Sequence, residues 1–234
     1  MWDFFRRLSW YGLDRGCHRP RGGNEEAIPE GEVRDCAVDL IRAFILCGGK
    51  SSRMGSDKAF LKLEGRPLVA RAVDVARQVT PEVSIVGDPE KFAPYGRVVS
   101  DIFRDCGPLG GIHAALRTSG SDWNLVLAVD LPFVTASFLD YLLGQAKSSG
   151  AVITVPSVRG YFQPLCAVYR RQFAPVAERA LGEGRNKIDA LFPLVTARFI
   201  TEEELTGAGY SSSIFRNVNT PDEWERAERE LRRG

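Results

Sequence analysis

Short apolar runs alternate with helical patterns from residue 41 onward, and this alternation dominates the chain. The run Asn124–Val129 is apolar on both alternating faces, as in a central parallel strand that helices cover on each side. Further strands are predicted at Phe44–Leu46, Val83–Val86 and Val98–Val99. Helices are predicted from Pro67, from Gly107 to Thr118, and from Thr135 to about Ser148. The pattern predicts an α/β fold in three layers, with a mostly parallel central sheet and helices on both faces.

The second half of the chain is less regular. Two apolar segments, Val152–Val155 and Leu165–Tyr169, bracket a loop and are predicted to pair as a hairpin. A helix is expected from about Gln172. The chain is predicted to finish with a strand near Ile214–Val218 and a helix that begins at Pro221, since proline suits the first helical position.

The first forty residues differ in character from the rest. Aromatic and arginine residues come first, and a polar segment rich in glycine and proline follows at 19–26. The segment lacks the apolar core and cleavage site of a secretory signal peptide. We therefore expect residues 1–40 to form a flexible N-terminal extension and residues 41–234 to form the folded domain.

Charge and cysteine content narrow the function classes. The 31 basic and 30 acidic residues nearly balance, so the chain has no net positive charge large enough to attract nucleic acid or an anionic membrane. No apolar run approaches the roughly 18 residues of a membrane span. The five cysteines are scattered, without a C-x-x-C pair, and only two histidines accompany them. A structural zinc site is not expected, and reduced cysteines predict a cytoplasmic protein.

One loop carries most of the chemical information. The apolar run Phe44–Leu46 ends in Gly48 and Gly49, and a basic, hydroxyl-rich segment then leads to Lys58. Glycines let the backbone approach an anion closely, while the side chains of Arg53 and Lys58 supply positive charge. These residues predict a phosphate-binding loop between a strand and a helix.

Two familiar phosphate loops are excluded by the glycine spacing. The first glycine of a Walker A loop would fall on Phe44, and the dinucleotide fingerprint G-x-G-x-x-G would need a glycine at Lys50. A glycine-rich turn with solvated charges remains the alternative at this point.

Two aspartates follow predicted strands. Asp130 comes directly after the run 124–129, and Asp101 follows Val98–Val99. Ligands of open α/β sheets bind beyond the carboxyl ends of strands, where a carboxylate is well placed to hold Mg²⁺. We expect both aspartates at neighbouring strand ends. The alternatives are a turn or helix-capping role for Asp130 and a surface position for Asp101.

The complete loop at 46–58, L-C-G-G-K-S-S-R-M-G-S-D-K, resembles the signature of the molybdenum cofactor guanylyltransferases, L-A-G-G-x-S-x-R-M-G-x-D-K, with Cys47 in place of alanine. Later segments also match the family. These are G-P-L-G-G-I at 107–112, V-D-L-P at 129–132 in place of C-D-x-P, Q-P-L at 163–165, and N-V-N-T-P at 217–221. The resemblance covers residues 41 to about 230.

The resemblance implies a Rossmann-like nucleotidyltransferase fold. It also implies a reaction in which GMP is transferred from GTP to molybdenum-bound molybdopterin and pyrophosphate is released. The implied cofactor is Mg²⁺. The implied catalytic residues are Arg53, Lys58 and Asp130. The implied nucleotide-binding residues are Leu46, Cys47, Gly48, Lys58, Asp101 and Asp130, and the implied metal ligand is Asp130. A phosphate nucleophile is already anionic, so the reaction needs no general base.

The expected partners are GTP and the molybdenum-bound pterin, with no nucleic acid and no membrane. The family also implies transient contact with molybdoenzymes or cofactor-delivery proteins. Arg185 and Lys187 are candidates for gripping the pterin phosphate, or they belong to an ordinary solvated loop.

Two rival functions remain. One is a CTP-dependent cytidylyltransferase of the same fold, acting on molybdopterin or on a sugar or polyol phosphate. The Gly48-Gly49 pair and the Asp57-Lys58 dipeptide favour GTP by resemblance. The other is a nucleotide-binding module without catalysis, which the presence of Lys58 and Asp130 disfavours.

Overall fold

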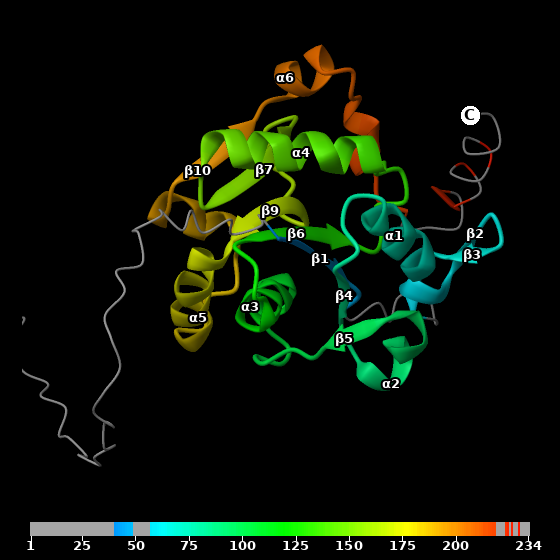
Figure 1. Ribbon diagram of the computed structural model, residues 1–234, viewed down its shortest axis with the longest axis horizontal. Helices are drawn as coiled ribbons and strands as arrows, with labels where there is room; N and C mark the ends of the chain where they lie inside the picture. The colour runs from blue at the N-terminus through cyan, green and yellow to red at the C-terminus, as the bar shows by residue number, and fades with distance from the viewer. Residues whose placement is uncertain (1–39, 49–56, 219–222, 225, 227–228, 230–234) are drawn as a thin grey trace, which may run out of the picture. The chain divides into compact units, whose positions relative to one another are not determined.

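A mixed sheet with the strand order β10-β7-β9-β6-β1-β4-β5 forms the centre of the fold (Figure 1). Its strands are β1 (Ile41–Leu46), β4 (Val83–Val86), β5 (Arg97–Val99), β6 (Trp123–Ala128), β7 (Ile153–Val158), β9 (Cys166–Arg170) and β10 (Ala197–Ile200). Strands β6, β1, β4 and β5 pair in parallel, and β10 is parallel to β7. Strand β9 runs antiparallel between β6 and β7. The expected mostly parallel sheet is confirmed.

The structure, a computed structural model, describes residues 40–48 and 57–218, together with 223, 224, 226 and 229. The described residues belong to one unit, residues 37–234. The expected N-terminal extension up to residue 39 and the middle of the glycine loop, 49–56, lie outside them. So does the start of the helix expected from Pro221.

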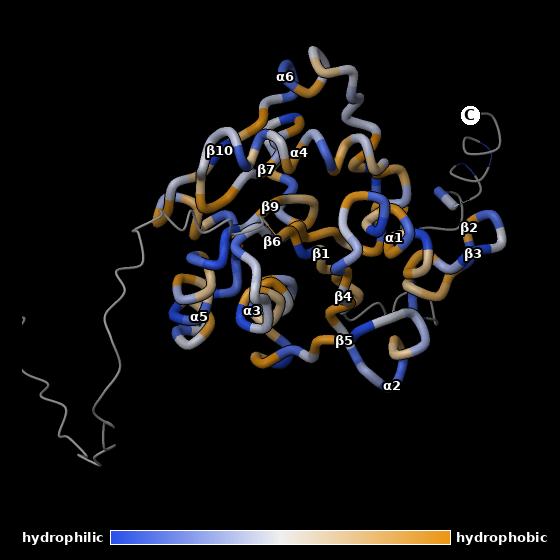
Figure 2. Tube along the Cα trace, in the orientation of Figure 1, coloured by the Kyte–Doolittle hydropathy of each residue, from blue (hydrophilic) through white to orange (hydrophobic). Residues whose placement is uncertain are grey.

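Helices cover both faces of the sheet, as expected. Helices α1 (Leu68–Arg77) and α4 (Ala136–Ser149) lie on one face, and α3 (Pro108–Thr118) and α5 (Ala174–Gly182) lie on the other (Figure 1). Side chains alternate along β1, so Ala43 and Ile45 join the core under α1 and α4, whereas Phe44 and Leu46 join the core under α3. Figure 2 shows the resulting apolar strands at the centre of the fold.

Smaller elements complete the described part of the chain. Two tight hairpins join β2 (Lys62–Leu63) to β3 (Arg66–Pro67) and β7 to β8 (Tyr161–Phe162). Both turns place a non-glycine residue and then a glycine at positive φ, the conformation that two-residue hairpins favour. The helices α2 (Pro89–Phe92) and α6 (Glu202–Gly207) are short. The 3₁₀ segments are η2 (Lys58–Phe60), η3 (Ala93–Tyr95), η4 (Arg171–Phe173), η5 (Asp189–Leu194) and η6 (Ser212–Phe215).

The strand predicted at Ile214–Val218 is wrong. Residues 212–215 form the 3₁₀ segment η6, because the Ser211 hydroxyl accepts a hydrogen bond from the backbone N–H of Ser213 and starts a turn. The ring of Phe215 then packs edge-on against Phe138 of α4, with ring centroids 5.3 Å apart. The apolar residues of this segment therefore serve helix packing and not a sheet.

The chain order of the strands creates a switch point beside β1. After β1 the chain adds β4 and β5 on one side, and it then returns through α3 to place β6 on the other side. Ligands of open α/β sheets bind at such a point, beyond the carboxyl ends of the strands. Within the described residues, no helix has both the length and the apolar character needed to cross a bilayer.

Candidate active site

An ion pair between Lys58 and Asp130 lies at the switch point. Asp130 follows β6, and Lys58 begins η2 where the chain leaves the glycine loop. The Lys58 Nζ donates to Asp130 Oδ2 at 2.8 Å, with the lysine side chain 11% exposed and the aspartate side chain 26% exposed. The backbone N–H of Val129 donates to the carbonyl of Leu46 at 3.1 Å, which fixes the end of β6 beside the end of β1. The structure thus joins two of the predicted site residues directly.

A cavity of about 440 Å³ opens beyond the ends of β1, β4 and β5. Its lining residues are Leu46, Gly48, Val86, Asp101, Asp105, Gly107, Pro108 and Gly111. A Cβ on Gly111 would lie 3.4 Å from side-chain atoms of Leu46 and Val86, so glycine lets α3 approach β1 and β4 closely at the border of the cavity. The volume falls in the usual range of small-molecule sites.

The cavity also contains the N-terminus of α3. Pro108 is the first residue of the helix and Gly107, at φ +66°, precedes it. A helix N-terminus carries a partial positive charge and unpaired N–H groups, which favour an anion. The G-P-L-G-G-I segment therefore contributes backbone to the cavity.

Asp101 lies in this cavity but not next to Asp130. Strands β1 and β4 separate β5 from β6, so the expectation of neighbouring strand ends is wrong. Asp101 instead leans toward the glycine loop, with Oδ2 3.9 Å from the position that a Cβ on Gly48 would occupy. Among the described residues, its buried Oδ1 has no hydrogen-bond partner. Burial raises the pKa of this carboxyl group.

Cys47 faces the opposite side of the sheet from this cavity. Its side chain packs in the core under α1 and α4, and its backbone N–H donates to the carbonyl of Val86 at 2.9 Å. Burial raises the pKa of the Cys47 thiol, and the charge of Asp57 raises it further. The thiol therefore stays protonated and is no nucleophile. Of the three predicted nucleotide-lining residues at this turn, Leu46 and Gly48 line the cavity.

A clamp holds the exit of the glycine loop. The Asp57 carboxylate accepts from the backbone N–H of Ala59 at 3.3 Å and from Lys91 Nζ of α2 at 3.1 Å. The ring of Phe60 stacks on Phe92, with centroids 5.3 Å apart. Lys91 carries no local sequence signal, because its partner is 34 residues away. The predicted catalytic residue Arg53 lies outside the described residues.

The donor chemistry at this edge suits a hard cation. Mg²⁺ is usually bound by one or two carboxylates and keeps waters and substrate phosphates as its other ligands. The carboxylate of Asp130 is a donor of this kind, and the carboxyl group of Asp101 lies in the neighbouring cavity. No cluster of three or more histidine, cysteine, aspartate or glutamate residues suited to a metal occurs in the part of the chain that the structure describes.

Comparison with known proteins identifies close relatives. Residues 43–206 match the family described as "MobA-like NTP transferase domain". The chain is 34% identical to the molybdenum cofactor guanylyltransferase of Desulfosudis oleivorans, over 84% of this chain and 98% of the relative. It is 36% identical to the probable molybdenum cofactor guanylyltransferase of Pelotomaculum thermopropionicum, over 78% of this chain and 89% of the relative.

A solved structure supports the same assignment. The molybdopterin-guanine dinucleotide biosynthesis protein A from Archaeoglobus fulgidus superposes with a TM-score of 0.72 at 28% identity, over 82% of this chain and all of that one. The sequence resemblance and the expected fold are therefore confirmed. The chain belongs to the MobA-like NTP transferase family, with relatives named molybdenum cofactor guanylyltransferase, and it is a nucleotidyltransferase.

Proposed function

We propose that this protein transfers GMP from GTP to the molybdenum-bound molybdopterin cofactor, forming the guanine dinucleotide cofactor and releasing pyrophosphate. The observation that carries the proposal is the Lys58–Asp130 pair at 2.8 Å, at the switch point beside a cavity of nucleotide size. The names of the relatives support guanine as the base and molybdopterin as the acceptor.

The reaction is an in-line displacement at phosphorus. A phosphate oxygen of the acceptor attacks the α-phosphorus of GTP and forms a new P–O bond. The bond from the α-phosphorus to the oxygen that bridges to the β-phosphorus breaks, and this oxygen leaves with the electron pair as part of pyrophosphate. The nucleophile is already anionic, so positioning and charge stabilisation are the main tasks of the protein.

The described residues suit these tasks. Lys58 would neutralise charge that develops on the phosphates, and its contact with Asp130 fixes the ammonium group in place. Leu46 and Gly48 would border the nucleotide, and the carboxyl group of Asp101, which lines the same cavity, would accept a hydrogen bond from it. Arg53 would supply a second cation from the glycine loop.

Asp130 would hold Mg²⁺, and Asp101 offers a second carboxylate on the nucleotide side. When bound, such an ion neutralises phosphate oxygens and acts as a Lewis acid. Lys58 shares the Asp130 carboxylate, so the protein itself already places one positive charge at this position.

The direct test measures pyrophosphate release with molybdenum-bound molybdopterin, Mg²⁺ and each of the four ribonucleoside triphosphates in turn. Turnover with GTP alone is the expected result. Turnover with CTP alone would instead establish a cytidylyltransferase. Tight nucleotide binding without any turnover would show a binding module that has lost catalysis.

Asp101→Asn should weaken GTP binding about tenfold but stabilise the fold. Burial raises the pKa of Asp101 in the folded state, so the ionised carboxyl opposes folding. The free energy of unfolding of the wild type should therefore fall as the pH rises from about 3.9, the ordinary pKa of an aspartate, through the raised pKa of Asp101 in the folded protein. The asparagine variant should not show this pH-dependent loss of stability. Its melting temperature should exceed that of the wild type by a few degrees at pH 7.

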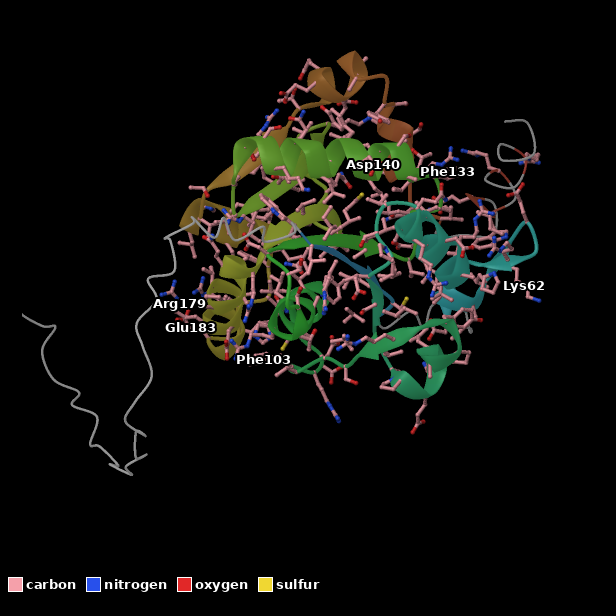
Figure 3. The ribbon with its side chains drawn as sticks, in the orientation of Figure 1. Lys62, Phe103, Phe133, Asp140, Arg179 and Glu183 are labelled. Atoms are coloured by element: carbon pink, nitrogen blue, oxygen red, sulfur yellow. The ribbon has the colours of Figure 1, made fainter. Side chains whose placement is uncertain are left out.

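Thermal melts between pH 4 and pH 8 measure this difference. Asp140→Asn is the matched control, because Asp140 is an exposed residue of α4 (Figure 3). If the difference in melting temperature between Asp101→Asn and the wild type did not widen as the pH rises, ionised Asp101 would not destabilise the folded protein, and the prediction would be contradicted.

Lys91→Ala should raise the KM for GTP about two- to fivefold and leave kcat nearly unchanged. The lysine is exposed and its pair with Asp57 is a surface ion pair, which limits the effect to about 1 kcal/mol. Lys91→Arg should restore the wild-type KM, and steady-state kinetics at varied GTP check both. An unchanged KM in the alanine variant would show that the Lys91–Asp57 ion pair does not contribute to GTP binding.

A further inference from the structure

A second cavity, of about 230 Å³, lies between α1 and the segment that follows β6, and we call it the α1 cavity. Most of its lining residues are apolar. These are Leu68, Ala72, Val75, Leu127, Val129, Leu131, Pro132 and Val134. The polar lining residues are Arg66, Arg71, Asp74 and Gln78. This mixture suits a molecule that has an apolar body and one polar group.

The helical repeat of α1 accounts for one wall of the cavity. Lining residues recur along the helix at intervals of three or four, at positions 68, 71, 72, 75 and 78, so they share one face. Leu68 and Ala72 are buried in the core, whereas Gln78 at the end of the helix is exposed. The cavity therefore extends from the core toward solvent.

The other wall is the loop that carries Asp130. Val129, Leu131 and Pro132 line the α1 cavity, whereas Asp130 itself contacts Lys58. Figure 1 shows the arrowhead of β6, where this loop begins, beside α1. Helices α1 and α3 cover opposite faces of the sheet, so the α1 cavity and the nucleotide cavity are separate, and no residue lines both.

One N–H group of Arg71 has no partner. Arg71 Nη1 donates to the Glu64 carboxylate at 3.0 Å and to the carbonyl of Leu63 at 3.5 Å, both at the β2–β3 hairpin. The Nε of Arg71 is buried and, among the described residues, has no hydrogen-bond partner. A buried donor without a partner is costly. An acceptor oxygen on an occupant of the cavity would supply the missing partner.

The charges of the lining favour an anionic oxygen. Among the described residues, the lining includes two guanidinium groups and one carboxylate, Asp74, which pairs with Arg66. The Gln78 side-chain amide donates to the backbone carbonyl of Asp74 at 3.4 Å. Guanidinium groups bind carboxylates through charge-assisted hydrogen bonds, which are stronger than those to neutral acceptors. A carboxylate is therefore better suited to this cavity than a cation.

The volume of the cavity limits the size of its ligand. An apolar cavity of about 150 Å³ holds benzene, and drug-sized ligands occupy sites of about 300–1,000 Å³. The α1 cavity, at about 230 Å³, lies between these two sizes. It can hold one ring with a short substituent.

We propose that the α1 cavity is a binding site for a small aromatic carboxylate. The ring packs against the apolar side chains of α1 and of the loop after β6, and the carboxylate accepts a hydrogen bond from Arg71 Nε. This inference is independent of the proposed function, because no lining residue of the α1 cavity takes part in the proposed transfer of GMP.

Benzoate is the probe, titrated into the full chain and followed by ligand-detected NMR. We expect one saturable site with a Kd on the order of 1 mM, as for other single-ring ligands. Benzylammonium keeps the ring but reverses the charge, and acetate lacks the ring, so each should bind at least about tenfold more weakly. Absence of saturable benzoate binding, or equal binding of either comparison probe, would overturn the proposal.

Two variants locate the bound benzoate. Arg71→Met removes the Nε donor, keeps an apolar side chain, and should weaken benzoate binding about tenfold. Val75→Phe fills the cavity, leaves Arg71 in place, and should abolish binding. Arg77→Met is the matched control, because Arg77 is an exposed residue of α1 that does not line the cavity. Wild-type affinity in both cavity variants, with melting temperatures that show them folded, would refute the site.

Competition with GTP distinguishes the α1 cavity from the nucleotide cavity. Benzoate binding should persist at saturating GTP and Mg²⁺, because the two cavities share no lining residue. Displacement of benzoate by GTP would instead place it at the N-terminus of α3 and contradict our inference. Failure of the protein to transfer GMP would refute only the proposed function, since the benzoate titration requires no turnover.

Discussion

Asp130→Asn should lower kcat for GMP transfer by at least about two to three orders of magnitude while the protein stays folded. Asparagine keeps the shape and an oxygen that can accept from Lys58 Nζ, but it removes the negative charge that would hold Mg²⁺. Pyrophosphate release at saturating GTP and molybdopterin measures the effect. Turnover near the wild-type level in this variant would remove Asp130 from the mechanism.

Asparagine is a better probe here than alanine. The Lys58 side chain is only 11% exposed, and Asp130→Ala would take away the carboxylate that lies 2.8 Å from its ammonium group. Loss of a partner of a largely buried cation costs about 1–3 kcal/mol or more, so the alanine variant should combine lost activity with a lower melting temperature. As a control, Asp140→Asn replaces an exposed residue of α4 and should change neither the activity nor the melting temperature.

Lys58→Ala should lower kcat about 10²- to 10³-fold and also raise the KM for GTP. The Lys58 side chain is largely buried, and a fixed charge in such a position stabilises developing phosphate charge more strongly than a solvated charge would. The same pyrophosphate assay measures the loss.

Two controls make the Lys58 result specific. Lys62→Ala changes an exposed lysine of β2 four residues further on (Figure 3), and it should leave both kinetic constants unchanged. Lys50→Ala, at the other end of the glycine loop, should cost less than Lys58→Ala. A larger loss of activity in Lys50→Ala than in Lys58→Ala would mean that Lys50, and not Lys58, supplies the charge that acts on the phosphates, and it would contradict our mechanism.

The sheet could be predicted where the apolar pattern was strong. Strands β1 and β6 are the longest parallel neighbours of the sheet, and the sequence predicted them at Phe44–Leu46 and Asn124–Val129, where the structure has Ile41–Leu46 and Trp123–Ala128. Strand β10 was missed because Ala197–Ile200 contains Arg198, which pairs with Glu204 of α6 and breaks the apolar run. The wrong strand at 214–218 had the opposite cause, since apolar residues there pack on a helix.

The candidate site was predicted in part for a similar reason. Strand ends can be located from local patterns, but the order of strands in a sheet depends on long-range packing. The pattern placed Asp101 and Asp130 at strand ends, yet it could not show that two strands lie between them. Lys91 was missed, because its partner Asp57 is distant in sequence.

The cavity beyond β1, β4 and β5 offers an anion main-chain groups, from Gly48, Gly107 and the N-terminus of α3. Main-chain N–H groups remain in place when a side chain is replaced. Directed evolution toward another nucleotide should therefore change the side chains around this cavity and leave anion binding by its backbone intact.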